Sequence, residues 1–94
     1  MIRIVKMNFY ADKVTEFLPV FEAAKPKIEA FEGCHNVTLV QDQNDPSLLM
    51  TISEWDDPEA LERYRNSDLF KATWAKTKTH FSEKPQAWSV DKIK

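Results

Sequence analysis

The richest local signal in this chain is the segment Ser53–Phe70, which combines a strand end with two helix starts. An apolar run at residues 48–52 contains β-branched members and predicts a strand. Asp57 followed by Pro58 is typical of an N-cap and a first helical residue. Ser67 offers a second N-cap, so we expect the helix to stop there and restart. A strand that passes so directly into a helix forms one wall of a cleft, and its aromatic residues favour a small-molecule pocket.

The remaining segments give the order β-α-β-β-α-β. Residues 2–10 alternate as a strand, and residues 34–41 and 47–55 flank a turn rich in Asp, Asn and Pro, which predicts a hairpin. Residues 85–93 form the last predicted strand. This order predicts an α+β, ferredoxin-like fold, in which a four-stranded antiparallel sheet is covered by helices on one face. We expect a single domain over residues 1–94.

A long helix is predicted between the first two strands. Apolar residues follow helical spacing over residues 14–31. Asp12 is the expected N-cap, and Gly33 is the expected C-terminal cap. Pro19 and Pro26 lie inside the pattern, and each removes a backbone donor. Because the apolar stripe continues across both prolines, we expect a bent helix that keeps one buried face.

Charge and composition narrow the class of protein. The net charge is −2, and residues of both signs are interspersed without a basic stripe, which argues against a nucleic-acid partner. No apolar run reaches the roughly 18 residues of a membrane span, and no signal peptide opens the sequence. Cys34 is the only cysteine, so no intramolecular disulfide can form. We therefore expect a cytoplasmic protein without a membrane partner.

The sheet face that points away from the helices is expected to be apolar. Successive side chains on a strand point to opposite faces, so either Met50 and Ile52 or Leu49 and Trp55 must lie on this face. Soluble monomers rarely expose so large an apolar patch. We therefore expect a homodimer that forms through this face.

Three segments resemble the antibiotic biosynthesis monooxygenase domain family of small dimeric α/β-barrel proteins. They are FEGCH at residues 31–35, EWDDPEAL at residues 54–61 and NSDLF at residues 66–70. Their glycine–cysteine turn, strand-end tryptophan and serine-led helix occur in the family's order and spacing. The resemblance covers nearly the whole chain and implies the dimeric α/β-barrel fold. It also implies oxygen chemistry without metal or flavin, in which the anion of an electron-rich phenol or quinol reacts directly with dioxygen.

The resemblance further indicates which positions form the site. Trp55 stands where antibiotic-pathway members have a tryptophan that contacts substrate, and Thr51 replaces an asparagine on the same strand face. Leu61 stands where a tyrosine proton donor is expected, and it cannot donate a proton. Many relatives have a histidine where this chain has Tyr64, and a glutamate where it has Ser53. Because this set is mostly absent, any activity needs a different proton acceptor.

The sequence thus predicts a cofactor-independent monooxygenase for a small aromatic substrate, a quinol or a polycyclic phenol, with no metal site. The expected cavity lies between the sheet and the helices, and its expected substrate-binding residues are Thr51, Trp55, Phe70 and Trp74. The candidate catalytic residues are Tyr64, whose hydroxyl could meet a substrate, His35, a candidate proton acceptor, and Asn8, which could face the pocket. These candidates also have purely structural explanations. The tryptophans of the substrate-binding set could simply pack in the core, and His35, which follows a turn, could simply lie at the surface.

Two other functions stay open at this point. Haem-degrading enzymes of the same superfamily use a helical histidine as the iron ligand, and aligning residues 67–72 with their pattern places Trp74 there. An indole nitrogen only donates hydrogen bonds, so this function is disfavoured. The other alternative is a non-catalytic dimer that binds a small hydrophobic molecule or has a stress-related role. The absence of most of the family's polar site residues favours this non-catalytic alternative.

Overall fold

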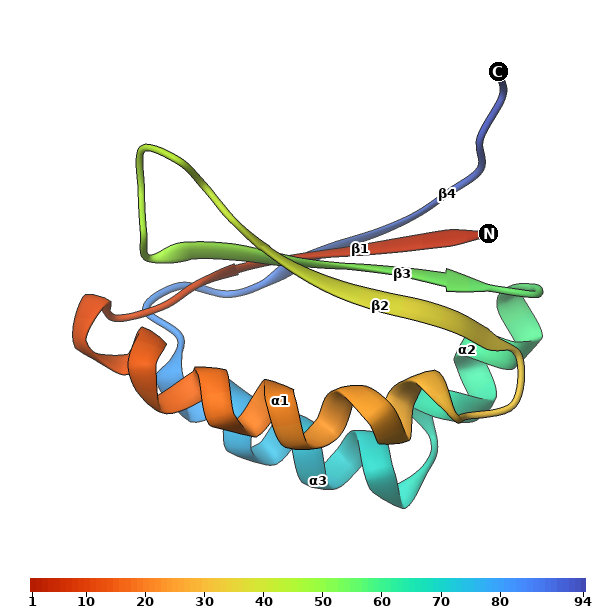
Figure 1. Cartoon of the computed structure of the whole chain (residues 1–94), viewed down its shortest axis with the longest axis horizontal. Coiled ribbons are helices and arrows are strands. Elements are labelled where there is room, and N and C mark those ends of the chain that lie inside the picture. Colours follow the sequence, from red (N-terminus) through yellow and green to blue (C-terminus); the bar gives the residue numbers. More distant parts are fainter.

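The chain folds into two layers, a sheet and a set of helices that covers one face of it (Figure 1). The computed structural model describes residues 1–94. In chain order, the elements are β1 (Ile2–Asn8), a 3-10 turn (Ala11–Lys13), α1 (Val14–Glu29), β2 (Cys34–Gln41), β3 (Leu48–Trp55), α2 (Pro58–Arg65), α3 (Asp68–Thr77), a second 3-10 turn (Lys78–His80) and β4 (Gln86–Val90).

The strands lie in the order β2-β3-β1-β4, and all neighbours are antiparallel. This arrangement confirms the predicted α+β ferredoxin-like fold and the predicted hairpin of β2 and β3. The last strand is shorter than predicted. It pairs with β1 from Gln86, opposite Lys6, to Val90, opposite Ile2, where β1 begins. Beyond Val90 no residue of β1 remains to pair with.

α1 passes through Pro19 and Pro26 without a break. It keeps the predicted apolar face, because every buried residue of the helix belongs to the predicted pattern: Val14, Phe17, Phe21, Ala24 and Ile28. Packing of this face against the sheet therefore outweighs the backbone hydrogen bonds that the two prolines remove.

The predicted caps of α1 are wrong. Asp12 lies in the 3-10 turn, which runs directly into the helix, and Lys13 occupies the N-cap position with helical dihedral angles and no side-chain cap. The helix ends at Glu29, well before Gly33. Gly33 instead adopts φ 86° in the turn before β2. A Cβ there would lie 2.5 Å from the Cβ of Ala60, so glycine permits the close approach of this turn to α2.

The predicted break between α2 and α3 is confirmed, as are both of its caps. The Asp57 carboxylate accepts a hydrogen bond from the Ala60 N–H at 2.8 Å. The Ser67 hydroxyl accepts one from the Phe70 N–H at 3.1 Å. These bonds satisfy backbone donors at each helix start, so the chain can turn sharply between the helices.

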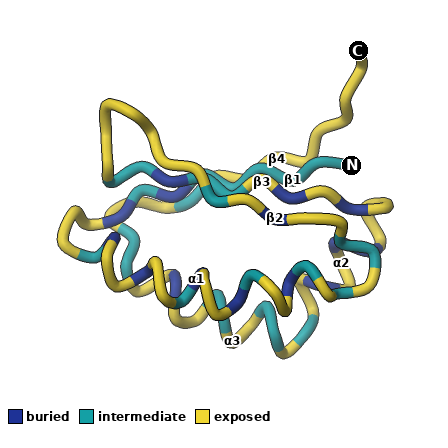
Figure 2. The backbone as a smooth tube through the Cα atoms, viewed as in Figure 1, coloured by how far each residue is buried: buried dark blue, intermediate teal, exposed yellow.

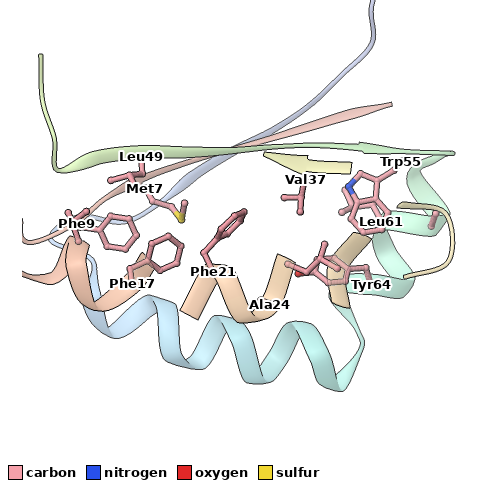
Figure 3. Packing of buried hydrophobic residues seen from close by; sticks show 13 residues of the cluster. Met7, Phe9, Phe17, Phe21, Ala24, Val37, Leu49, Trp55, Leu61 and Tyr64 are labelled. Carbon is pink, nitrogen blue, oxygen red and sulfur yellow. The ribbon is translucent and has the colours of Figure 1, made fainter. Parts of the chain in front are cut away.

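The main core lies between the sheet and the helices (Figure 3). Leu49 and Trp55 belong to it, at 1% and 2% exposure, so β3 presents Met50 and Ile52 on the opposite face. That outer face has no covering layer, and the tube of β4 is exposed along its length (Figure 2). Its exposed apolar side chains are Val40, Ile52, Trp88 and Val90. None of the helices is both long and apolar enough to cross a membrane.

Candidate active site

A cavity of about 330 Å³ lies between the inner face of the sheet and the helices, and it is partly open to solvent. Thirteen of its 21 lining residues are hydrophobic. Ligand pockets in proteins span roughly 300–1,000 Å³ and are mostly apolar with a few polar groups. The cavity therefore suits one small ligand of one or two rings rather than a large polycyclic molecule.

Four aromatic residues form a continuous wall of the cavity. The ring of Trp55 lies 5.1 Å from that of Tyr64, and Tyr64 meets Phe70 edge-to-face at 5.2 Å. Phe70 stacks on Trp74 at 5.7 Å with an interplanar angle of 11°. The break at Ser67 brings the end of α2 and the first turn of α3 together, which is why these rings meet. All four residues line the cavity, as does Thr51 from β3. The residues expected to bind substrate thus lie together.

Tyr64 is the one predicted catalytic residue that lines the cavity. It is buried, and Figure 3 shows its hydroxyl oxygen directed into the space between the sheet and the helices. Burial, and after it the nearby Cys34 thiolate, raise the pKa of Tyr64 to about 12. The phenol therefore keeps its proton at neutral pH. It can donate a hydrogen bond to a ligand oxygen, but it is not available as a proton acceptor.

His35 and Asn8 lie outside the cavity. The β2–β3 register shifts between Cys34 and Asn36, so His35 sits in a bulge on the surface, where its Nε2 lies 2.5 Å from Asp56 Oδ1. Asn8 pairs with Leu48 at the end of β1, on the face that points away from the helices. The structure therefore brings neither side chain to the predicted site, because a bulge displaces one and strand alternation turns the other away.

Two arginines that the sequence reading did not select line the cavity, Arg3 from β1 and Arg65 from the end of α2. The Arg3 guanidinium donates a hydrogen bond to Ser89 Oγ at 3.0 Å and has no carboxylate within 4.0 Å. Arg65 forms an ion pair with Glu62 at 3.3 Å. Strand alternation places Arg3 on the same face as Val5, but only the pairing of β1 with β3 and β4 shows that this face lines the cavity.

The electrostatic balance at these arginines is positive. Burial, followed by the charge of Arg65, lowers the pKa of the Arg3 guanidinium, and the carboxylate of Glu62 raises it. An arginine stays protonated despite such shifts. No histidine, aspartate or glutamate is among the lining residues. No group of three or more His, Cys, Asp or Glu side chains is arranged to hold a metal ion.

Solved structures of the same fold cover nearly the whole chain. The crystal structure of an antibiotic biosynthesis monooxygenase has a TM-score of 0.90 at 20% identity and covers 100% of both chains. A conserved protein from Methanosarcina mazei Go1 has a TM-score of 0.86 at 25% identity, over 92% of this chain and 86% of that chain. PA3566 from Pseudomonas aeruginosa has a TM-score of 0.86 at 20% identity, over 99% and 93% of the two chains.

At the sequence level, no curated protein matches the chain significantly. The sequence model of the antibiotic biosynthesis monooxygenase family does match, over residues 1–76. This match spans β1 through most of α3 and includes the strand-end Trp55 and the serine-led helix that carried the resemblance. The chain therefore belongs to the antibiotic biosynthesis monooxygenase family.

Proposed function

We propose that the protein is a monooxygenase that oxidises a small aromatic quinol or phenol in this cavity without a bound cofactor. The observation that carries the proposal is the continuous wall of Trp55, Tyr64, Phe70 and Trp74 around a space of about 330 Å³, in a chain of a monooxygenase family. Flat aromatic faces stack on one another favourably, so this wall selects a flat aromatic ligand.

The reaction can be balanced with the quinol as the only electron source. One oxygen atom of dioxygen enters the ring, the other leaves as water, and the quinol becomes a hydroxyquinone. On this proposal Phe70 and Trp74 hold the ring, and the Tyr64 phenol donates a hydrogen bond to the substrate oxygen on which negative charge develops. Thr51 supplies a second hydroxyl to the same space.

The proton of the substrate has no obvious acceptor in the cavity, because no lining residue is a histidine, aspartate or glutamate. A substrate whose hydroxyl ionises readily would bypass this need by losing its proton to water. The same observation favours the alternative of a non-catalytic protein that binds a small hydrophobic molecule. Binding and oxygen consumption must therefore be measured separately.

The test uses a naphthohydroquinone as substrate and an oxygen electrode, with the protein-free autoxidation rate subtracted. We expect protein-dependent oxygen uptake and, with isotopically labelled dioxygen, one labelled oxygen atom in the hydroxynaphthoquinone product. Tyr64→Phe should lower the rate, and Tyr10→Phe is the matched control, because Tyr10 is 54% exposed and lies outside the cavity. Binding of the quinol without oxygen uptake would refute the enzyme and support the non-catalytic alternative.

We also propose that the protein is a homodimer that forms through the outer face of the sheet. Ile52, Trp88 and Val90 are 37%, 44% and 38% exposed, and strand pairing places them together with Ile4 and Ile2. A second copy presents the same patch, so a two-fold arrangement can cover both faces at once. Burial of such an apolar patch contributes the favourable free energy of association that a stable dimer requires.

A further inference from the structure

We propose that the cavity binds its aromatic ligand as an anion and that Arg3 holds the ligand's planar oxyanion, which is either a carboxylate or an ionised ring hydroxyl. This inference rests on the proposed function only for the choice of cavity. It concerns the charge of the ligand, and it can hold or fail whether or not oxygen is consumed.

The sheet directs Arg3 into the cavity. On β1, Arg3 shares the inward face with Val5, and the register places it between Ser53 of β3 and Ser89 of β4. Its guanidinium is fixed at one nitrogen, which donates to Ser89 Oγ at 3.0 Å. A guanidinium carries five N–H donors, so the remaining ones can reach a ligand. Arg3 is thus a positioned cation with spare donors in a half-buried site.

No protein group neutralises this cation directly. No carboxylate lies within 4.0 Å of the Arg3 guanidinium, and Arg65 lines the same cavity. The carboxylate whose charge raises the pKa of Arg3 is that of Glu62, which is already paired with Arg65 at 3.3 Å. Two guanidinium groups and one carboxylate leave an excess of positive charge at this end of the cavity. An anion would offset that excess, whereas a ligand cation would add to it.

The remaining lining residues indicate what the anion is attached to. The aromatic wall begins at Trp55, and Trp55 follows Ser53, the β3 partner of Arg3, on the same strand face. A ligand ring against this wall would therefore place a ring substituent toward the arginine. The planar fork of a guanidinium matches a carboxylate through two parallel hydrogen bonds, and it binds a single phenolate oxygen through one or two.

An anion site here would also account for the missing proton acceptor. Positive charge beside a bound phenol favours the ionised form and lowers the pKa of that phenol. The cavity would then select the phenolate from solution, and no side chain would need to remove the proton. This role differs from that of Tyr64, which keeps its own proton and donates a hydrogen bond.

The experiment compares ligands of the same shape and different charge by isothermal titration calorimetry. Naphthoate is an anion, and naphthamide is its uncharged analogue. We expect the wild type to bind naphthoate about tenfold or more tightly than naphthamide, because hydrogen bonds between two charged groups are stronger than those to an uncharged amide. Arg3→Gln should abolish this preference, because it should weaken naphthoate binding about tenfold or more and naphthamide binding far less. Arg63→Gln is the matched control, because it removes the same charge from an exposed position on α2 outside the cavity.

A third ligand, a nitronaphthol compared in its ionised and neutral forms, separates the two sources of the oxyanion. Tighter binding of the ionised nitronaphthol than of naphthoate would assign a phenolate, and the reverse would assign a carboxylate. Arg3→Lys keeps the charge without the fork and should give an intermediate preference, so the test survives if Arg3→Gln does not fold. Equal affinity of the wild type for naphthoate and naphthamide would overturn the proposal, as would an equal effect of Arg63→Gln. Absence of oxygen uptake would count against the proposed function alone.

Discussion

The indole Nε1–H of Trp55 donates a hydrogen bond at 2.9 Å to the hydroxyl of Ser53, two residues earlier on the same face of β3. Both residues are buried, at 2% and 7% exposure. The indole has no other polar atom, so Trp55 offers only its ring to a ligand. Ser53, which stands where many relatives have a glutamate, therefore has a structural role: it accepts the hydrogen bond of the buried Trp55 indole.

Ser53→Ala should destabilise the protein. The substitution leaves the buried indole N–H of Trp55 without a partner, which costs about 1–3 kcal/mol. Urea denaturation followed by circular dichroism measures the free energy of unfolding. Ser89→Ala serves as the control, because Ser89 is exposed and its loss should cost less than about 0.5 kcal/mol. Equal stabilities of the two variants would show that the Trp55–Ser53 bond contributes nothing.

Gly33→Ala should destabilise the protein for two separable reasons. A left-handed backbone costs a residue with a Cβ roughly 1–2 kcal/mol, and Gly33 has φ 86°. The new methyl group would also clash with the Cβ of Ala60, which lies 2.5 Å from its position. In a double-mutant cycle, Ala60→Gly removes the clash and leaves the backbone cost. We expect Gly33→Ala to cost less in the Ala60→Gly background than in the wild type. Strict additivity would rule out the contact.

Tyr64 should make stability fall at high pH. Its pKa is 10.0 without the fold and about 12 in the native state, so the native protein binds more protons between these values. Stability from this group is therefore complete below pH 10.0 and is lost as the pH rises through about 12. The loss is on the order of 2 kcal/mol. Tyr64→Phe should show a shallower decline than the wild type, whereas Tyr10→Phe should follow the wild type. Superimposable profiles for wild type and Tyr64→Phe would contradict the assignment.

The outer face of the sheet should drive dimer formation. Light scattering at micromolar concentration should give the mass of a dimer, with an interface that buries more than about 1,200 Å² in total. Ile52→Glu should produce a monomer, because it places a charge in the centre of the apolar patch. Leu18→Glu is the matched control: Leu18 is 38% exposed and Ile52 is 37% exposed, but Leu18 lies on α1. A monomeric wild type would contradict the dimer.

Haem should not form a saturable, histidine-ligated complex with the wild type. Neither His35 nor His80 lines the cavity, and the Trp74 indole cannot ligate iron. Titration with hemin should therefore show no one-to-one change in the Soret band or in the iron spin state. Trp74→His should gain a weak histidine-ligated spectrum if the cavity admits the macrocycle. A histidine-type spectrum in the wild type that disappears on mutation of either histidine would contradict this prediction.

Local chemistry explains why part of this structure could be predicted from the sequence. The Asp57 and Ser67 caps depend only on residues within the same helix turn, and both are where the sequence placed them. The aromatic wall also follows from strand alternation and helical spacing, which fix the inward face of each element. Thr51 and Trp55 were selected through the resemblance to the family, and Phe70 and Trp74 through helical spacing; all four line the cavity.

The residues that were misplaced depend on contacts between distant segments. His35 lies in a bulge that arises only when β2 pairs with β3, and the conformation of Gly33 is fixed by its contact with Ala60 of α2. Arg3 was overlooked because a charged side chain is normally solvated, and its inward position becomes clear only when β1 lies between β3 and β4. None of these relations has a signature in a single stretch of sequence.

The alternation of β1 limits how its length can change. Arg3 and Val5 line the cavity, and Ile2 and Ile4 lie on the outer face between the same two strands. Suppose that one residue is inserted after Val5 and that the residues after the insertion keep their pairing with β3 and β4. The residues before it would then exchange faces, because side chains along a strand alternate with a period of two. The arginine would enter the apolar patch and the isoleucines would enter the cavity. Insertions or deletions within this strand should therefore be tolerated only in steps of two residues.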